Sequence, residues 1–164
     1  MHPELHRPVT LDRVGPAGLH VVVEASSTEC AALAHRMNLP AVLTLNCTFR
    51  LERDAGGALV ARGHLVARIV QTCVISLEDF TATVEERFAV RCVPEGEESD
   101  DGDPASLDEI TYSNATVDLG EAAAEQMALA LDPYPRAPGA VLPDLPDDVE
   151  APSFAALAAL RRRH

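Results

Sequence analysis

The 164-residue sequence contains no lysine and no tryptophan, and all 13 of its basic side chains are arginine. No apolar run approaches the roughly 20 residues of a transmembrane helix, so we expect no membrane partner. The first residues also lack the apolar stretch of a signal peptide, which favours a cytoplasmic protein. With 47% apolar residues, the composition fits a single domain over residues 1–164 and excludes collagen-like or wholly disordered chains.

Catalytic motifs are missing too: there is no GxSxG, no Walker-type glycine loop, no GxGxxG and no HExxH. The cysteines, Cys30, Cys47, Cys73 and Cys92, are widely spaced and form no CxxC pair, which favours reduced core thiols over zinc ligands. His64 as a general base is a weaker interpretation than a solvated surface histidine. We therefore expect a non-enzymatic protein with no cofactor and no metal.

The 26 acidic residues give a net charge of −13, but they are unevenly distributed. Eight acids and no base lie in 95–109, and four more acids lie in 144–150, so the rest of the chain is nearly neutral. Because like charges repel and these stretches lack apolar periodicity, we expect a mobile acidic loop at about 95–115 and an acidic proline-rich linker at about 138–152.

These acidic stretches are interpreted first as solubilising segments. The alternative is a docking site for a basic partner, with four candidate residues, Glu97, Glu98, Asp100 and Asp101. The overall acidity argues against a DNA partner, because affinity for phosphate comes mostly from basic groups.

Alternating apolar residues predict strands over 19–25, 43–51, 59–75 and 84–92. Capping patterns predict helices that begin after Ser26, Asp118 and Ser153, and prolines from Pro133 onward end the second. The expected fold is therefore α+β: an antiparallel β-sheet meander, with strong curling left open, and two to three helices packed on its apolar face.

Five arginines fall outside the apolar sets of the predicted strands: Arg50, Arg62, Arg68, Arg87 and Arg91. If the strands pair as a meander, several of these guanidiniums share the outer surface of the sheet with His64. A guanidinium is a planar fork that suits phosphate oxygens, so these arginines are candidates for RNA contact. An ordinary charged outer face is the alternative, since glutamates lie among them.

The order of several segments resembles the YceD family, the large ribosomal RNA subunit accumulation proteins of bacteria and plastids. The segments are Gln71–Glu78, Phe88–Pro94, the helix that opens with Asp-Leu-Gly-Glu and ends in Asp-Pro-Tyr-Pro, and the tail Pro152–Leu160. The similarity extends over nearly the whole chain. The family-motif residues are Asp118, Leu119, Glu121, Pro133, Pro135 and Phe154.

This resemblance implies a non-enzymatic ribosome-biogenesis factor that supports synthesis, processing or stability of large-subunit (23S) rRNA. Many relatives carry Cys-x-Arg-Cys in the central strand, which suggests metal binding in those members. Here the matching positions are Val70 to Cys73, with one cysteine and the arginine missing, so zinc is not expected.

Three mechanisms remain open. The first is direct rRNA contact through the arginines. The second is an adaptor that docks a basic ribosomal protein or an assembly enzyme through the acidic loop. The third is a small hydrolase or ligand-binding barrel without a recognisable motif. The oligomeric state is not predicted.

Overall fold

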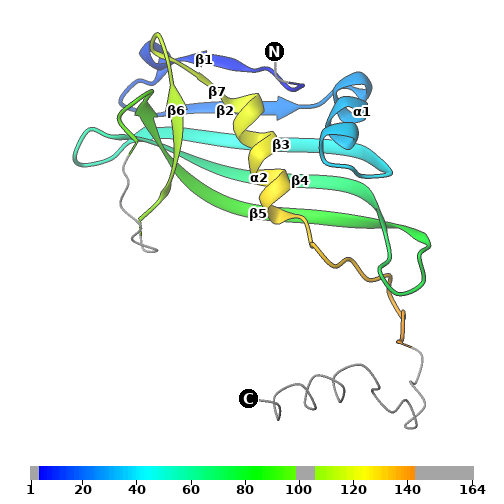
Figure 1. Cartoon of the computed structure of the whole chain (residues 1–164). Helices are drawn as coiled ribbons and strands as arrows, with labels where there is room; N and C mark the ends of the chain where they lie inside the picture. The colour runs from blue at the N-terminus through cyan, green and yellow to red at the C-terminus, as the bar shows by residue number, and fades with distance from the viewer. Residues whose placement is uncertain (1–3, 99–105, 143–164) are drawn as a thin grey trace, which may run out of the picture.

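The computed structural model describes residues 4–98 and 106–142, and the structural statements below refer to these residues. The main sheet has five strands, in the order β2 (Leu19–Glu24), β3 (Ala41–Arg53), β4 (Leu59–Thr72), β5 (Asp79–Pro94) and β6 (Asp108–Tyr112). Figure 1 shows this sheet with the two helices, α1 (Ser27–Arg36) and α2 (Leu119–Ala130), packed against it. A second, two-stranded sheet pairs β1 (Pro8–Thr10) with β7 (Thr116–Asp118), and a 3₁₀ turn, Leu11–Arg13, follows β1.

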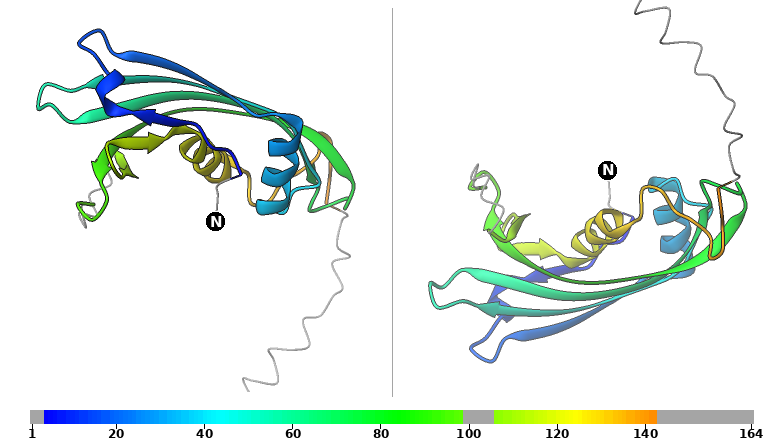
Figure 2. Two further views of the ribbon diagram at one scale, coloured as in Figure 1. Left: turned by 90° about the horizontal axis from the view of Figure 1, so that it is seen from above. Right: turned by 90° about the horizontal axis from the view of Figure 1, so that it is seen from below.

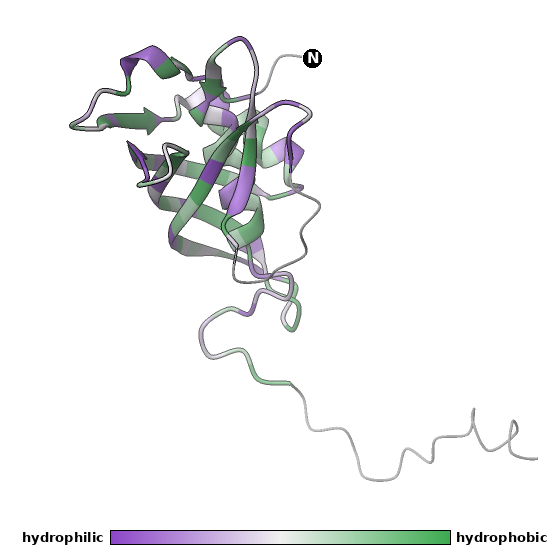
Figure 3. Ribbon diagram, turned by 90° about the vertical axis from the view of Figure 1, so that its left-hand side faces the viewer, coloured by the Kyte–Doolittle hydropathy of each residue, from purple (hydrophilic) through white to green (hydrophobic). Residues whose placement is uncertain are grey.

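The long strands form where apolar and polar residues alternate, because successive side chains in a strand point to opposite faces. Strand β3 buries Leu45, Cys47, Phe49 and Leu51 while the residues between them face outward. Figure 3 shows this alternation as green and purple segments along the strands. The antiparallel meander from β2 to β5 confirms the central part of the predicted fold.

Both helices begin where the sequence predicts. The Ser26 side chain accepts a hydrogen bond from the Glu29 backbone, and the Glu29 carboxylate accepts one from the Ser26 backbone, which completes the capping box of α1. The Asp118 side chain caps α2 through the backbone amides of Gly120 and Glu121. Helix α2 ends at Ala130, before Pro133, as predicted, because proline has no backbone N–H and cannot continue the helix.

The sheet bends gently around the two helices, so its helix-bearing face is concave and its outer face is convex (Figure 2). The core lies on the concave side, where Leu33 of α1 and Met127 of α2 meet Leu45, Leu65 and Ile69 of the strands, all with 0% exposure. Neither described helix covers the convex outer face. No helix within the described residues is long and apolar enough to cross a membrane.

The sheet differs from the predicted one in the pairing of β6 and in the end of β4. Strand β6 pairs with β5 in parallel, so the sheet is mixed rather than an antiparallel meander throughout. The strong curling that the sequence leaves open does not occur in the described sheet. Strand β4 ends at Thr72, before the predicted Ile75, because the chain turns there and the Cys73 backbone amide bonds the Glu78 carbonyl at 2.9 Å.

The acidic loop predicted at about 95–115 contains strand β6, which the sequence pattern does not predict. Ile110 and Tyr112 pack on the core from alternate positions of this strand, but two apolar residues among acids give a weak alternation signal. A turn with positive φ at Asn114 and Ala115 then leads from β6 to β7. The predicted third helix and most of the proline-rich linker lie outside the described residues.

Candidate nucleic-acid interface

The strand register brings basic side chains together on the convex outer face. Arg50 of β3 lies directly opposite Arg62 of β4, and His64 of β4 lies opposite Arg87 of β5. Residues that face each other across neighbouring strands share one face of the sheet, and like charges in this position are destabilising. Sheet stability therefore does not explain why three arginines converge here, whereas an anionic ligand would.

These residues line a shallow depression of about 650 Å³. The outer-face residues that line it are His20, Thr48, Arg50, Arg62, His64, Arg87 and Ala89. Phe49, Gly63 and Phe88 also contribute, and because they alternate with the outer-face residues, they present backbone to this side. No carboxylate is among the described residues that line the depression, so its charge is positive.

Two of these basic side chains, Arg50 and His64, contact glutamates at the border of the depression. Arg50 donates from Nε to the Glu52 carboxylate and contacts His20 Nε2 at 2.9 Å, and this guanidinium lowers the pKa of Glu52. The ring nitrogen Nε2 of His64 lies 2.8 Å from Glu85 Oε1. These contacts orient the side chains along the face.

Arg62 and Arg87 differ from Arg50, because neither makes a hydrogen bond or an ion pair within the described part of the chain. Both side chains are exposed. Their guanidiniums are therefore available to the oxygens of an anionic ligand, and a planar guanidinium can bind two phosphate oxygens at once.

The other two candidate arginines do not line the depression. Arg68 lies six residues beyond Arg62 on β4, about 20 Å along the strand, between Thr44 and Thr83. Arg91 is opposite Val60 and also neighbours β6 in the register. Three of the five arginines that the sequence singled out therefore line the depression, and Arg91 lies beside it, two residues from Ala89 on the same face of β5.

Sequence reasoning missed His20 and Thr48 as members of this cluster. Both occupy polar positions of alternating segments, so their faces were readable from the sequence. Their closeness to Arg62 and Arg87 could not be predicted from the sequence, because it depends on which strands pair and in which register.

The acidic docking candidates lie beyond the end of β5. Glu97 and Glu98 are exposed, and the Glu97 backbone amide bonds the Pro94 carbonyl at 3.0 Å to form a turn. Asp100 and Asp101 lie outside the described residues. A separate cleft between β6 and α2 is lined by four acids, Glu109, Asp118, Glu121 and Glu125.

Asp118 of the family motif holds the N-terminal segment against α2. Besides capping the helix, its carboxylate accepts from the backbone amide of Arg7 at 2.8 Å and contacts His6 Nδ1 at 2.5 Å. The next motif residue, Leu119, has 0% exposure. Gly120 follows it, and a Cβ there would lie 2.4 Å from the Leu5 carbonyl oxygen, so only glycine permits this close packing.

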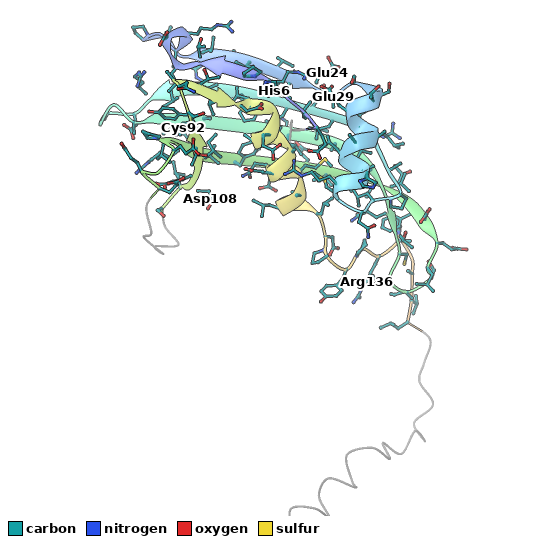
Figure 4. All side chains as sticks on the ribbon, turned by 45° about the horizontal axis from the view of Figure 1, so that its top comes forward. His6, Glu24, Glu29, Cys92, Asp108 and Arg136 are labelled. Carbon is teal, nitrogen blue, oxygen red and sulfur yellow. The ribbon has the colours of Figure 1, made fainter. Side chains whose placement is uncertain are left out.

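Ion pairs extend this junction to α1. Arg36 binds Glu121 at 2.6 Å and Glu4 at 3.0 Å, and Arg7 binds Glu29 at 2.8 Å. Figure 4 shows Glu29 on α1 and His6 between α1 and the start of α2. The Asp-Leu-Gly-Glu motif therefore builds the structure and does not form the basic depression.

The proline segment after α2 also has a structural contact. The Pro135 carbonyl accepts from the Val74 backbone amide at 2.9 Å, which attaches this segment to the turn between β4 and β5. Pro133 follows directly after Asp132 and is exposed. Phe154, the last motif residue, lies outside the described residues.

The four cysteines are buried and unpaired. Burial raises the pKa of Cys47 to about 12 and that of Cys92 to about 11. Cys73 differs: hydrogen bonds from Ser76, followed by a backbone amide at Ala137, lower its pKa to about 6. No group of three or more metal-ligating side chains occurs among the described residues.

Comparison with known proteins gives one match. A family model described as large ribosomal RNA subunit accumulation protein YceD matches residues 61–161, which is more than half of the chain but less than the nearly full length that the resemblance suggested. No curated protein and no solved structure matches the chain significantly. The matched region contains Arg62, Arg87 and the Asp-Leu-Gly-Glu motif. The chain therefore belongs to the YceD family, whose name connects it with the accumulation of large-subunit ribosomal RNA.

Proposed function

We propose that this protein is a non-enzymatic ribosome-biogenesis factor of the cytoplasm that contacts large-subunit (23S) rRNA through the convex face of its sheet. In this role it supports synthesis, processing or stability of that RNA. The observation that carries the proposal is the depression lined by Arg50, Arg62 and Arg87 without a carboxylate. Arginine forks of this kind bind phosphate oxygens, and the family name supplies the RNA.

The net charge of −13 does not oppose this function. The chain cannot wrap RNA as a uniformly basic clamp would, but a local basic face needs only a few phosphate contacts. Negative charges elsewhere on the surface, such as those of Glu97 and Glu98, repel phosphate groups and so limit non-specific binding to other nucleic acids, including DNA.

The proposal is tested by depleting the protein in its own organism and measuring the ratio of large-subunit to small-subunit rRNA. We expect the ratio to fall and to be restored by the wild-type chain. The double variant Arg62→Ala/Arg87→Ala should fail to restore it. The charge-matched control Arg13→Ala/Arg136→Ala should succeed, because these arginines are exposed and lie off the outer face.

Two outcomes separate the family role from the mechanism. An unchanged rRNA ratio after depletion would reject a role in rRNA accumulation. A lowered ratio that Arg62→Ala/Arg87→Ala restores fully would keep the role and reject the outer face as the point of contact.

A second candidate function is a protein adaptor without direct RNA contact. It is supported by the exposed Glu97 and Glu98 after β5, which could bind the basic segments of a ribosomal protein or an assembly enzyme. Under this candidate, Glu97→Gln/Glu98→Gln weakens co-purification with ribosomal particles, whereas Arg62→Ala/Arg87→Ala leaves it unchanged. The opposite pattern supports direct RNA contact.

A further inference from the structure

Among the described residues, the outer face of the sheet offers no large aromatic ring to a ligand. No phenylalanine or tyrosine of the described strands faces outward from the sheet beside the arginines. Phe49 and Phe88, which lie in the same strands as Arg50 and Arg87, face the core instead. Proteins that bind single-stranded RNA on a sheet commonly stack its bases on exposed aromatic side chains. The outer face therefore lacks the usual means of holding unpaired bases.

Hydroxyl and amide side chains stand among the arginines. Thr44, Asn46 and Thr48 follow one another on the outer face of β3, and Thr83 lies on β5. All four are exposed, and none makes a side-chain hydrogen bond within the described part of the chain. Such groups can donate to and accept from a ribose 2′-hydroxyl, which is a donor and an acceptor itself.

The shape of this face also discriminates between nucleic acids. The sheet is convex on the side that carries Arg62 and Thr48 (Figure 2), and strands β2 to β5 give it a width of about 15 Å. A-form RNA has a wide, shallow minor groove that displays 2′-hydroxyls, and a deep, narrow major groove that side chains cannot read. A broad convex surface with short polar side chains matches the wide, shallow minor groove.

We propose that the outer face binds double-stranded, A-form RNA across its minor groove. Arg62 and Arg87 contact the phosphates, and Thr48, which lies on β3 opposite His64 and also lines the depression, contacts 2′-hydroxyls. This inference rests on the proposed function and narrows its substrate to base-paired segments of RNA. It predicts recognition of shape and backbone rather than of base sequence.

The test measures binding of the full-length protein to three labelled probes by fluorescence anisotropy at one salt concentration. The probes are an RNA duplex of about 16 base pairs, one of its strands alone, and the DNA duplex of the same sequence. We expect the RNA duplex to bind about tenfold more tightly than the single strand, which finds no stacking platform on this face. Arg62→Ala/Arg87→Ala should abolish this binding, and Arg13→Ala/Arg136→Ala should leave it unchanged.

The Thr48→Val substitution tests the contact with the 2′-hydroxyl. It removes one hydroxyl at nearly constant volume on an exposed position, so the fold should be retained. We expect it to weaken binding to the RNA duplex about threefold or more, with no change for the DNA duplex.

Each result decides between the proposals. Equal or tighter binding of the single strand overturns the duplex inference and leaves the proposed RNA contact standing. Equal binding of the two duplexes overturns recognition of the minor groove. Failure to bind any of the RNA probes overturns both the inference and the proposed direct contact.

Discussion

Phe49 and Phe88 meet edge to face, with ring centroids 5.7 Å apart, although strand β4 lies between the strands that carry them. The contact is possible because Gly63 occupies the position between them in the register and has no side chain. A Cβ at Gly63 would lie 2.1 Å from Phe88 Cζ. Gly63 also contributes to the basic depression on the opposite face, so one position serves both the core and the candidate interface.

Gly63→Ala should destabilise the fold by about 1–3 kcal/mol, because the Phe88 ring must move away from an overpacked position. Urea unfolding followed by circular dichroism measures the change. Gly15→Ala is the matched control, since a Cβ there meets nothing within 4 Å, and it should change stability by less than about 0.5 kcal/mol. Equal stability of the two variants would contradict the steric argument.

Asp118→Ala should lower stability by about 1–2 kcal/mol, because it removes the cap of α2 and leaves the Arg7 backbone amide without its acceptor. Asp118→Asn should lose less, since an amide oxygen can still accept these bonds. Urea unfolding of both variants, with limited proteolysis near the N-terminus, provides the measurement. Similar losses for the two substitutions would mean that charge, and not hydrogen bonding, holds the junction.

The Arg7–Glu29 pair should make stability depend on pH in the acid range. The hydrogen bond from Arg7 lowers the pKa of Glu29 from 4.5 to about 2. A carboxyl with a lowered folded-state pKa stabilises the fold above its unfolded value, and this contribution is lost as the pH falls through the folded value. Glu29→Gln should therefore cost about 1–2 kcal/mol near neutral pH, since solvent screens a partly exposed pair.

This difference between the wild type and Glu29→Gln should shrink between pH 4.5 and about 2, as urea unfolding at several pH values can show. Glutamine retains the capping box, so the comparison isolates the ion pair. Glu98→Gln is the control, because Glu98 is exposed and has no partner among the described residues. A pH-independent difference would exclude the Arg7–Glu29 pair as its source.

Cys73 should be a thiolate at neutral pH, unlike the other cysteines. Hydrogen bonds from Ser76 lower its pKa to about 6. The ultraviolet absorbance of the native protein should therefore show one thiolate titrating near pH 6, and Cys73→Ala should remove this step. Ser76→Ala should move the step to higher pH.

The same titration has a consequence for stability. The pKa of Cys73 is lower in the folded protein, about 6, than its ordinary value of 9.0. The Cys73 thiolate therefore contributes fully to the free energy of unfolding above pH 9, and this contribution is lost as the pH falls through about 6. The stability difference between the wild type and Cys73→Ala should grow as the pH rises from about 6 to 9. A difference that does not change with pH would contradict the lowered pKa of Cys73.

Binding of the protein to duplex RNA should weaken as salt increases, because phosphate contacts release counterions. Arg62→Ala and Arg87→Ala should each make the negative slope of the log association constant against log salt concentration shallower by about 0.7–0.9. Arg68→Ala should reduce it less, since Arg68 lies outside the depression. Equal effects of all three substitutions would indicate a diffuse electrostatic attraction without a defined site.

Much of the fold could be predicted from the sequence, because the residue patterns that specify its helices and long strands are local. The capping box at Ser26 and the cap at Asp118 lie within a few residues of the helices that they start. The alternation in β3 follows from which side chains can be buried on one face. These features depend on short-range backbone chemistry and on hydrophobic burial, so the sequence alone determined the two helices, the four strands of the central meander and the outward direction of their arginines.

The tertiary structure alone decided what these elements bring together. Arg50 faces Arg62 because β3 and β4 pair in one particular register, and a shift of one residue would turn either side chain to the core. The parallel addition of β6 and the contact of Asp118 with Arg7 join positions that are far apart in the chain. Such pairings arise from the packing of the whole core, and no local pattern encodes them.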